Sequence, residues 1–145
     1  MSTAENKALA TRFVASLSDL TGQSLAPLLT ESSTFSLMVR SRGLPLASEL
    51  TGAQFIELMH EMTKVLPDGV RHEPKWMIAE GDYVAVETDC HAALPGGRAY
   101  NNAFVFILRM RDGRVDEVRE YCDLLHAKEA LFPEPAAESA ATGVA

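Results

Sequence analysis

Carboxylate, imidazole and thiol side chains alternate along two stretches of the sequence that otherwise have the composition of β-strands. Glu87, Asp89 and His91 occupy every second position of YVAVETDCHAA, and Glu120 and Cys122 do so in RVDEVREYC. Successive side chains of a strand point to opposite faces, so each set shares one face of its strand. If Asp89 and Glu120 face the same apolar cavity, the two carboxylates cannot both ionise cheaply, and the pair can hold one proton. That property suits general acid–base catalysis at neutral pH.

The positions of these residues suggest a role for each of them. Glu120 neighbours the most apolar strand, so we expect burial to raise its pKa and make it the acid, with Asp89 as the ionised base. The two roles can be exchanged, because coupled carboxylates titrate as a pair. Asn102 can donate a hydrogen bond to a substrate oxygen, or be a strand asparagine with its hydrogen bonds satisfied internally. His91 is either a further catalytic residue or a histidine at the rim.

Two other interpretations account for the same residues. In the first, the strand is simply amphipathic: its even-numbered residues from Val84 to Cys90 face the core, while Glu87, Asp89 and His91 face solvent. A metal site built from Asp89, His91 and Glu120 is a weaker interpretation, since one histidine with scattered carboxylates is a poor ligand set for zinc. We therefore expect neither a metal nor a cofactor.

The strands that would carry these residues fill the second half of the chain. Tyr100 to Met110 is apolar at both odd and even positions, which predicts a central strand buried on both faces. Asp112-Gly113 predicts a tight turn after it, because both residues tolerate positive φ. The predicted strands are 70–79, 83–93, 100–110 and 114–122.

The first half of the chain has helical patterns. Ser2-x-x-Glu5 predicts a capping box at the start of a helix that ends at Gly22, and Thr51 with Gln54 predicts another helix, which continues to Leu66. Between these two helices we expect a short helix over 24–30, a strand over 33–39 and a loop over 40–50. We expect a last helical segment over 123–131, after the strands. Helices followed by an antiparallel meander predict an α+β fold, in which a cone-shaped curved sheet wraps around the N-terminal helices and encloses an apolar pocket.

Composition limits the possible functions. The chain has 145 residues and a net charge of −7, which predicts one domain over 1–132 and argues against nucleic-acid binding. We expect the tail over 133–145, which has few bulky apolar residues, to be disordered. No apolar run is long enough for a membrane span, the first residues lack the apolar core of a signal peptide, and Cys90 and Cys122 form no CxxC motif. These features predict a cytoplasmic protein with reduced thiols.

The order of elements, together with YNNAFVFILRMRDGRVDEVREYCDLL, resembles the nuclear transport factor 2-like superfamily. Within it the sequence is most similar to the SnoaL-like group, which includes polyketide cyclases, ketosteroid isomerases and limonene epoxide hydrolases. The resemblance is strongest over 94–131 and implies the conical fold. It says less about function, because this fold carries enzymes, binding modules and assembly domains.

The resemblance matches only some of the catalytic residues of the epoxide hydrolases to equivalent residues in this chain. Their two catalytic aspartates correspond to Asp89 and Glu120, but Glu87 stands in place of the orienting arginine. The tyrosine and asparagine that hold the water correspond to Phe35 and Leu37. The base of the ketosteroid isomerases also corresponds to a position near Leu37, so the resemblance supports neither mechanism in full.

We therefore expect a cofactor-independent enzyme that acts on a small hydrophobic molecule as an isomerase, cyclase, hydrolase or lyase. The alternatives are a non-catalytic ligand-binding domain and a dimerisation domain of the same fold. The two-sided apolar sheet also predicts a homodimer. Besides the candidate catalysts Asp89, Glu120, Asn102 and His91, the expected contacts to substrate are Glu87, Phe104, Phe106, Phe13, Leu37, Trp76 and Cys122.

Overall fold

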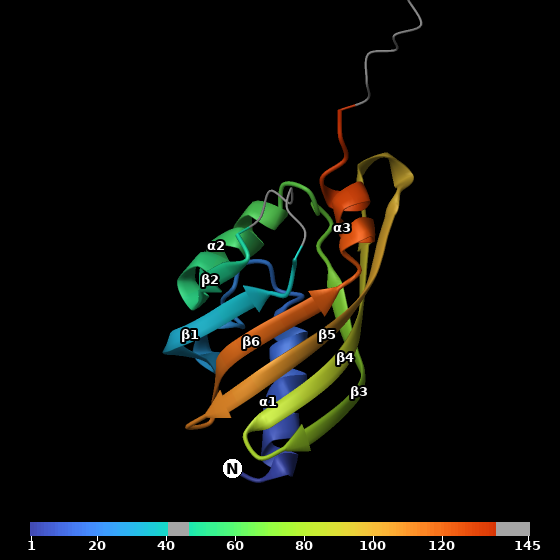
Figure 1. Ribbon diagram of the computed structural model, residues 1–145. Coiled ribbons are helices and arrows are strands. Elements are labelled where there is room, and N and C mark those ends of the chain that lie inside the picture. Colours follow the sequence, from blue (N-terminus) through green and yellow to red (C-terminus); the bar gives the residue numbers. More distant parts are fainter. Residues whose placement is uncertain (41–46, 136–145) are drawn as a thin grey trace, which may run out of the picture.

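A curved, open sheet of six strands, with helices against it, makes up the part of the chain that the structure describes, residues 1–40 and 47–135 (Figure 1). The structure is a computed structural model. The strand order is β2-β1-β6-β5-β4-β3, and the fold is α+β, as the sequence predicts. The strands are β1 (Leu29–Leu37), β2 (Glu49–Thr51), β3 (Arg71–Glu80), β4 (Tyr83–Ala93), β5 (Ala99–Arg111) and β6 (Arg114–Cys122). The helices are α1 (Thr3–Ser16), α2 (Gly52–Met62) and α3 (Leu124–Leu131).

Both predicted capping boxes are present. The Ser2 hydroxyl accepts a hydrogen bond from the Glu5 backbone N–H, and the Glu5 carboxylate accepts one from the Ser2 N–H. Thr51 and Gln54 make the same reciprocal pair at the start of α2. Each box satisfies backbone donors that a helix start would otherwise leave unpaired.

The ends of these helices differ from the prediction. α1 ends at Ser16 rather than Gly22, and turns fill the interval up to Gly22, whose φ of 74° favours glycine. The expected helix over 24–30 is a single 3-10 turn, Ala26–Leu28, with Pro27 in that turn. α2 ends at Met62 instead of Leu66.

β1 is longer than predicted and lies between β2 and β6. It starts at Leu29, pairs antiparallel with β2, and pairs parallel with β6, so the sheet is not wholly antiparallel. β2 begins within the predicted loop over 40–50. Residues 41–46 of that loop, and residues 136–145 of the predicted tail, lie outside the described residues.

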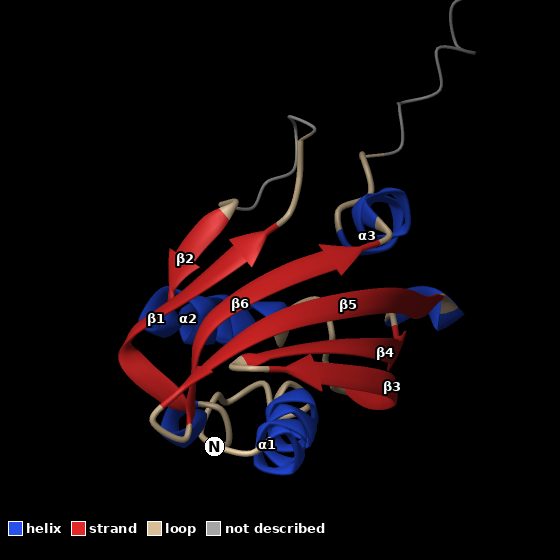
Figure 2. Ribbon diagram, turned by 60° about the horizontal axis from the view of Figure 1, so that its bottom comes forward, coloured by secondary structure: helices blue, strands red, loops and turns tan. Residues whose placement is uncertain are grey.

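β5 is central, but the prediction that it is buried on both faces is wrong. Even positions such as Phe106 and Leu108 are buried, whereas most odd positions are exposed, with Val105 37% exposed. Its odd positions lie on the convex face of the sheet, which no described element covers. The core lies on the other face, where α1 packs on β3 and β4 and α2 packs on β1 (Figure 2).

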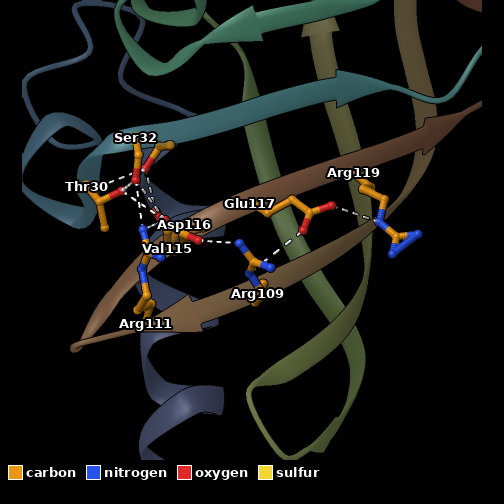
Figure 3. A network of polar contacts seen from close by, with 9 residues as sticks. Thr30, Ser32, Arg109, Arg111, Val115, Asp116, Glu117 and Arg119 are labelled. Carbon is orange, nitrogen blue, oxygen red and sulfur yellow. Dashed lines mark hydrogen bonds and ion pairs between the residues drawn. The ribbon is translucent and has the colours of Figure 1, made fainter.

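A cluster of polar side chains joins β1 to β6 at the end of the sheet opposite α3 (Figures 1 and 3). Asp116, only 3% exposed, accepts hydrogen bonds from Thr30 and Ser32 on one side and from Arg109 and Arg111 on the other. Burial by itself would raise the pKa of Asp116, but these hydrogen bonds and the Arg111 charge outweigh it and lower the pKa. The cluster fixes β1 beside β6, which carries Glu120.

Candidate active site

An apolar pocket lies between the inner face of the sheet and helices α2 and α3. Its volume is about 160 Å³, similar to that of a protein cavity that can hold a benzene ring. Aromatic rings form much of its wall, including Phe35 and Phe55, which stack with centroids 3.9 Å apart. The lining residues with ionisable side chains are His72, Cys90, Tyr100, Glu120 and Cys122, and the described lining includes no lysine or arginine.

Glu120 is the carboxylate of this pocket. It lies on β6 between Leu37 of β1 and Phe106 of β5, and both of these neighbours also line the pocket. Burial raises the pKa of Glu120 from 4.5 to about 7, because a carboxylate loses its hydration in apolar surroundings. Its side chain makes no hydrogen bond or ion pair with another described residue. Glu120 can therefore both hold and release a proton near neutral pH.

The structure does not place Asp89 with Glu120. Asp89 lies on the convex face of β4, where its carboxylate pairs with the Lys75 ammonium at 3.1 Å. The inward positions of β4 are Val84, Val86, Thr88 and Cys90, all buried. The expectation of a carboxylate pair in the cavity is thus corrected, and the amphipathic interpretation of this strand describes its geometry.

Three further polar candidates also lie outside the pocket. Glu87 is exposed on the convex face opposite Trp76 of β3. His91 lies beyond Asp89 on the same face and its Nδ1 is 3.1 Å from the Asn101 side-chain oxygen. Asn102 is buried and bonds to Tyr100 and Asp123 rather than lining the cavity.

The apolar candidates divide between the pocket and its surroundings. Phe104, Phe106, Leu37 and Cys122 line the pocket. Phe13 of α1 lies behind the wall, in the core, with its ring centroid 5.7 Å from that of Phe106.

Trp76 is 57% exposed on the convex face and cannot reach the pocket. An irregularity in the β3–β4 pairing between Pro74 and Trp76 reverses the alternation of β3. His72 therefore points inward before it, and Met77 packs against the core after it.

Sequence reasoning missed His72, Tyr100 and Cys90 as pocket residues. Burial lowers the pKa of His72 to about 4 and raises that of Cys90 to about 12, so both side chains are uncharged at neutral pH. His72 packs edge-on against Phe104, with ring centroids 5.5 Å apart. Cys90 and Tyr100 occupy inward positions of β4 and β5, so strand parity could have identified both once the inner face was known.

The described residues contain no group of three His, Cys, Asp or Glu side chains that could hold a metal ion. In the same part of the chain, no helix is both long and apolar enough to cross a membrane.

Residues 10–118 match the model of a protein family, the SnoaL-like domain. The chain belongs to this family. The match begins within α1, covers the sheet as far as the middle of β6, and ends just before Glu120. No curated protein matches the sequence.

Solved structures share the fold of this SnoaL-like chain at low sequence identity. AclR from Streptomyces galilaeus, a proposed hydroxylase, is 23% identical over 97% of this chain and 93% of its own, with a TM-score of 0.73. A proposed SnoaL-like polyketide cyclase from Jannaschia sp. CCS1 is 19% identical over 92% and 95%, with a TM-score of 0.71. TerC, which was crystallised with polyporic acid, is 20% identical over 88% and 98%, with a TM-score of 0.75.

Proposed function

We propose that this SnoaL-like protein is a cofactor-independent enzyme that moves a proton on a small, uncharged, hydrophobic substrate, as cyclases and isomerases do. The observation that carries the proposal is Glu120, one carboxylate in an apolar pocket with its pKa raised to about 7. Keeping a partly buried acid in apolar surroundings costs folding free energy, which a purely structural domain has no reason to bear. The resemblance of the fold to a proposed polyketide cyclase is consistent with this class of reaction.

The chemistry follows from the pKa of Glu120. At neutral pH, a group with a pKa of about 7 is present in both forms, so the carboxylate can take a proton from carbon and the acid can return one. An enolisable carbonyl compound suits this exchange, since removal of its α-proton leaves a delocalised enolate. Proton return at a different atom gives an isomer, and attack of the enolate carbon on a second carbonyl closes a ring.

Exchange of the α-protons of 2-indanone in D2O tests the proposal without knowledge of the natural substrate. We expect the protein to accelerate this exchange, as followed by NMR, and Glu120→Gln to lower the accelerated rate by roughly two to four orders of magnitude. Asp89→Asn removes a carboxylate from the convex face and should leave the rate within about threefold of wild type.

Two results would reject catalysis by Glu120. One is a Glu120→Gln rate within a few-fold of wild type. The other is equal losses in Glu120→Gln and Asp89→Asn, which would show that the effect is not specific to the pocket. Either result would favour the ligand-binding domain.

A further inference from the structure

Tyr100 brings a phenol hydroxyl to the same pocket as Glu120. Its side chain is 4% exposed and lines the cavity from β5. The ring stacks on the imidazole of His126 in α3, with centroids 5.4 Å apart and planes within 6° of parallel. One hydrogen bond to its oxygen is present, from the side-chain amide of Asn102 at 2.9 Å.

The hydrogen bonds of Asn102 determine which way the Tyr100 proton points. The Asn102 Oδ1 accepts from the Asp123 backbone N–H at 3.1 Å, and its Nδ2 donates to the Asp123 carbonyl at 3.1 Å. An amide flip would place two donors together and two acceptors together, so these two bonds fix the amide orientation. The second Nδ2 hydrogen then goes to Tyr100, and the phenol oxygen must accept it. Consequently the phenol proton cannot point towards Asn102.

No described residue accepts that phenol proton. Burial raises the pKa of Tyr100, and the nearby Glu120 charge acts in the same direction, so the hydroxyl stays protonated at neutral pH. The pocket thus combines a carboxylate of near-neutral pKa with an O–H donor that is not used within the described chain. A buried donor without a partner is uncommon in folded proteins, and a catalytic role is one explanation for such a group.

We propose that Tyr100 donates a hydrogen bond to the carbonyl oxygen of the substrate, and that Asn102 is the positioning residue that directs the phenol proton into the pocket. This inference rests on the proposed function, and it defines the substrate as a carbonyl compound bearing an enolisable C–H bond. The Glu120 carboxylate takes the proton from carbon, the C–H electron pair becomes the C=C bond of the enolate, and the C=O π pair moves to oxygen. Tyr100 stabilises that oxyanion by a hydrogen bond and keeps its own proton.

The carbonyl stretch of bound 1-indanone measures this donor directly. We expect the infrared band of 1-indanone to shift to lower frequency in the wild-type pocket, and the shift to disappear in Tyr100→Phe. The same substitution should weaken 1-indanone binding about two- to tenfold, the range for one hydrogen bond. Binding of indane, which has the same ring system without the oxygen, should change less than twofold. Tyr121→Phe, on the convex face, is the control and should change neither ligand.

Asn102→Asp tests the positioning role separately from the stability of the fold. The substitution replaces the Nδ2 donor with an acceptor, so Tyr100 should donate to the new carboxylate, and the shift of the 1-indanone band should be lost although the phenol is present. Retention of the full shift in folded Asn102→Asp would overturn the role of Asn102. An unshifted band in the wild type, or a shift that survives Tyr100→Phe, would overturn the role of Tyr100.

These measurements are equilibrium measurements and do not require turnover. Catalysis by Glu120 can therefore fail, through unchanged proton exchange in Glu120→Gln, while the Tyr100 donor is still detected by its infrared shift. Conversely, proton exchange that depends on Glu120, together with an unshifted carbonyl band, would reject only the inference on Tyr100 and Asn102.

Discussion

Glu120 and His72 respond to the same apolar surroundings with opposite consequences for stability. Burial favours the neutral form of each side chain, which raises the pKa of the carboxyl group to about 7 and lowers that of the imidazole to about 4. Between pH 4.5 and 7 the unfolded chain releases the Glu120 proton first, so this group makes the fold less stable as pH rises. Between pH 6.5 and 4 the unfolded chain binds a proton at His72 first, so this group makes the fold less stable as pH falls.

Single substitutions should separate these two opposing effects. The pKa shift of Glu120 and that of His72 each correspond to about 3 kcal/mol at most in the free energy of unfolding. We expect Glu120→Gln to be more stable than wild type by up to about 3 kcal/mol at pH 8, with the difference vanishing near pH 4. We expect His72→Gln to remove most of the loss that His72 causes below pH 6.5. Urea denaturation at pH 4.5, 6 and 8 measures both differences, with Asp89→Asn and His91→Gln as controls outside the pocket.

A difference between Glu120→Gln and wild type that is independent of pH would show that Glu120 does not titrate as described. The same conclusion would hold for His72 if His72→Gln kept the full acid sensitivity of the wild type.

At the scale of elements, the parallel contact between β1 and β6 depends on side chains as well as on the backbone ladder. The register of the pair shifts between Leu29 and Thr34, and the hydroxyls of Thr30 and Ser32 meet Asp116 there. Figure 3 shows Arg109 and Arg111 approaching the same carboxylate from β5. Asp116 therefore joins three strands at a point where the regular ladder is interrupted.

Asp116→Asn should destabilise the fold by about 1–3 kcal/mol, because the hydroxyls and guanidinium groups around this buried position lose a charged acceptor. The lowered pKa of Asp116 stabilises the wild type above pH ~4, and this contribution is lost as pH falls below that value. The difference between variant and wild type should therefore shrink at pH 3 in urea denaturation. Glu117→Gln, the adjacent and more exposed carboxylate, is the matched control, with an expected change within about 0.5 kcal/mol. Equal losses in the two variants would contradict a special role for Asp116.

At the scale of the whole molecule, the convex face of the sheet carries several large exposed apolar side chains, and a patch of such side chains is typical of an interaction surface. Its large exposed side chains are those of Trp76, Ile78, Tyr83, Val105 and Tyr121. Charged residues such as Lys75 and Asp89 lie among them and can form complementary pairs across an interface. We expect a homodimer formed through this face.

Sedimentation at micromolar concentration should give about twice the chain mass of 15.8 kDa. Trp76→Glu should shift the protein towards the monomer, because it places a charge within the apolar patch, where an interface would remove it from water. Leu125→Glu changes a still more exposed apolar residue on α3, away from the convex face, and should leave the dimer intact. A wild-type mass near 15.8 kDa would exclude the dimer at that concentration.

The sequence by itself determined what depends on neighbouring residues. Ser2 with Glu5, and Thr51 with Gln54, start their helices as predicted, and the bounds of β4 and β6 agree with the pattern. These features are local, because a cap or a turn involves residues a few positions apart. The SnoaL-like family could likewise be recognised from the order of such elements.

Only the tertiary structure decided which residues share the pocket. Alternation shows that Glu87, Asp89 and His91 share a face of one strand, but which face is inward depends on pairing with β3 and β5. One irregularity in β3 was enough to turn Trp76 outward, and Asp89 lies on the face opposite Glu120. The partners of Asn102 lie on either side of it along the chain, yet the structure was needed to show that its amide orients Tyr100. Strand alternation carries no information about neighbouring strands, and the contacts between strands place the reactive groups.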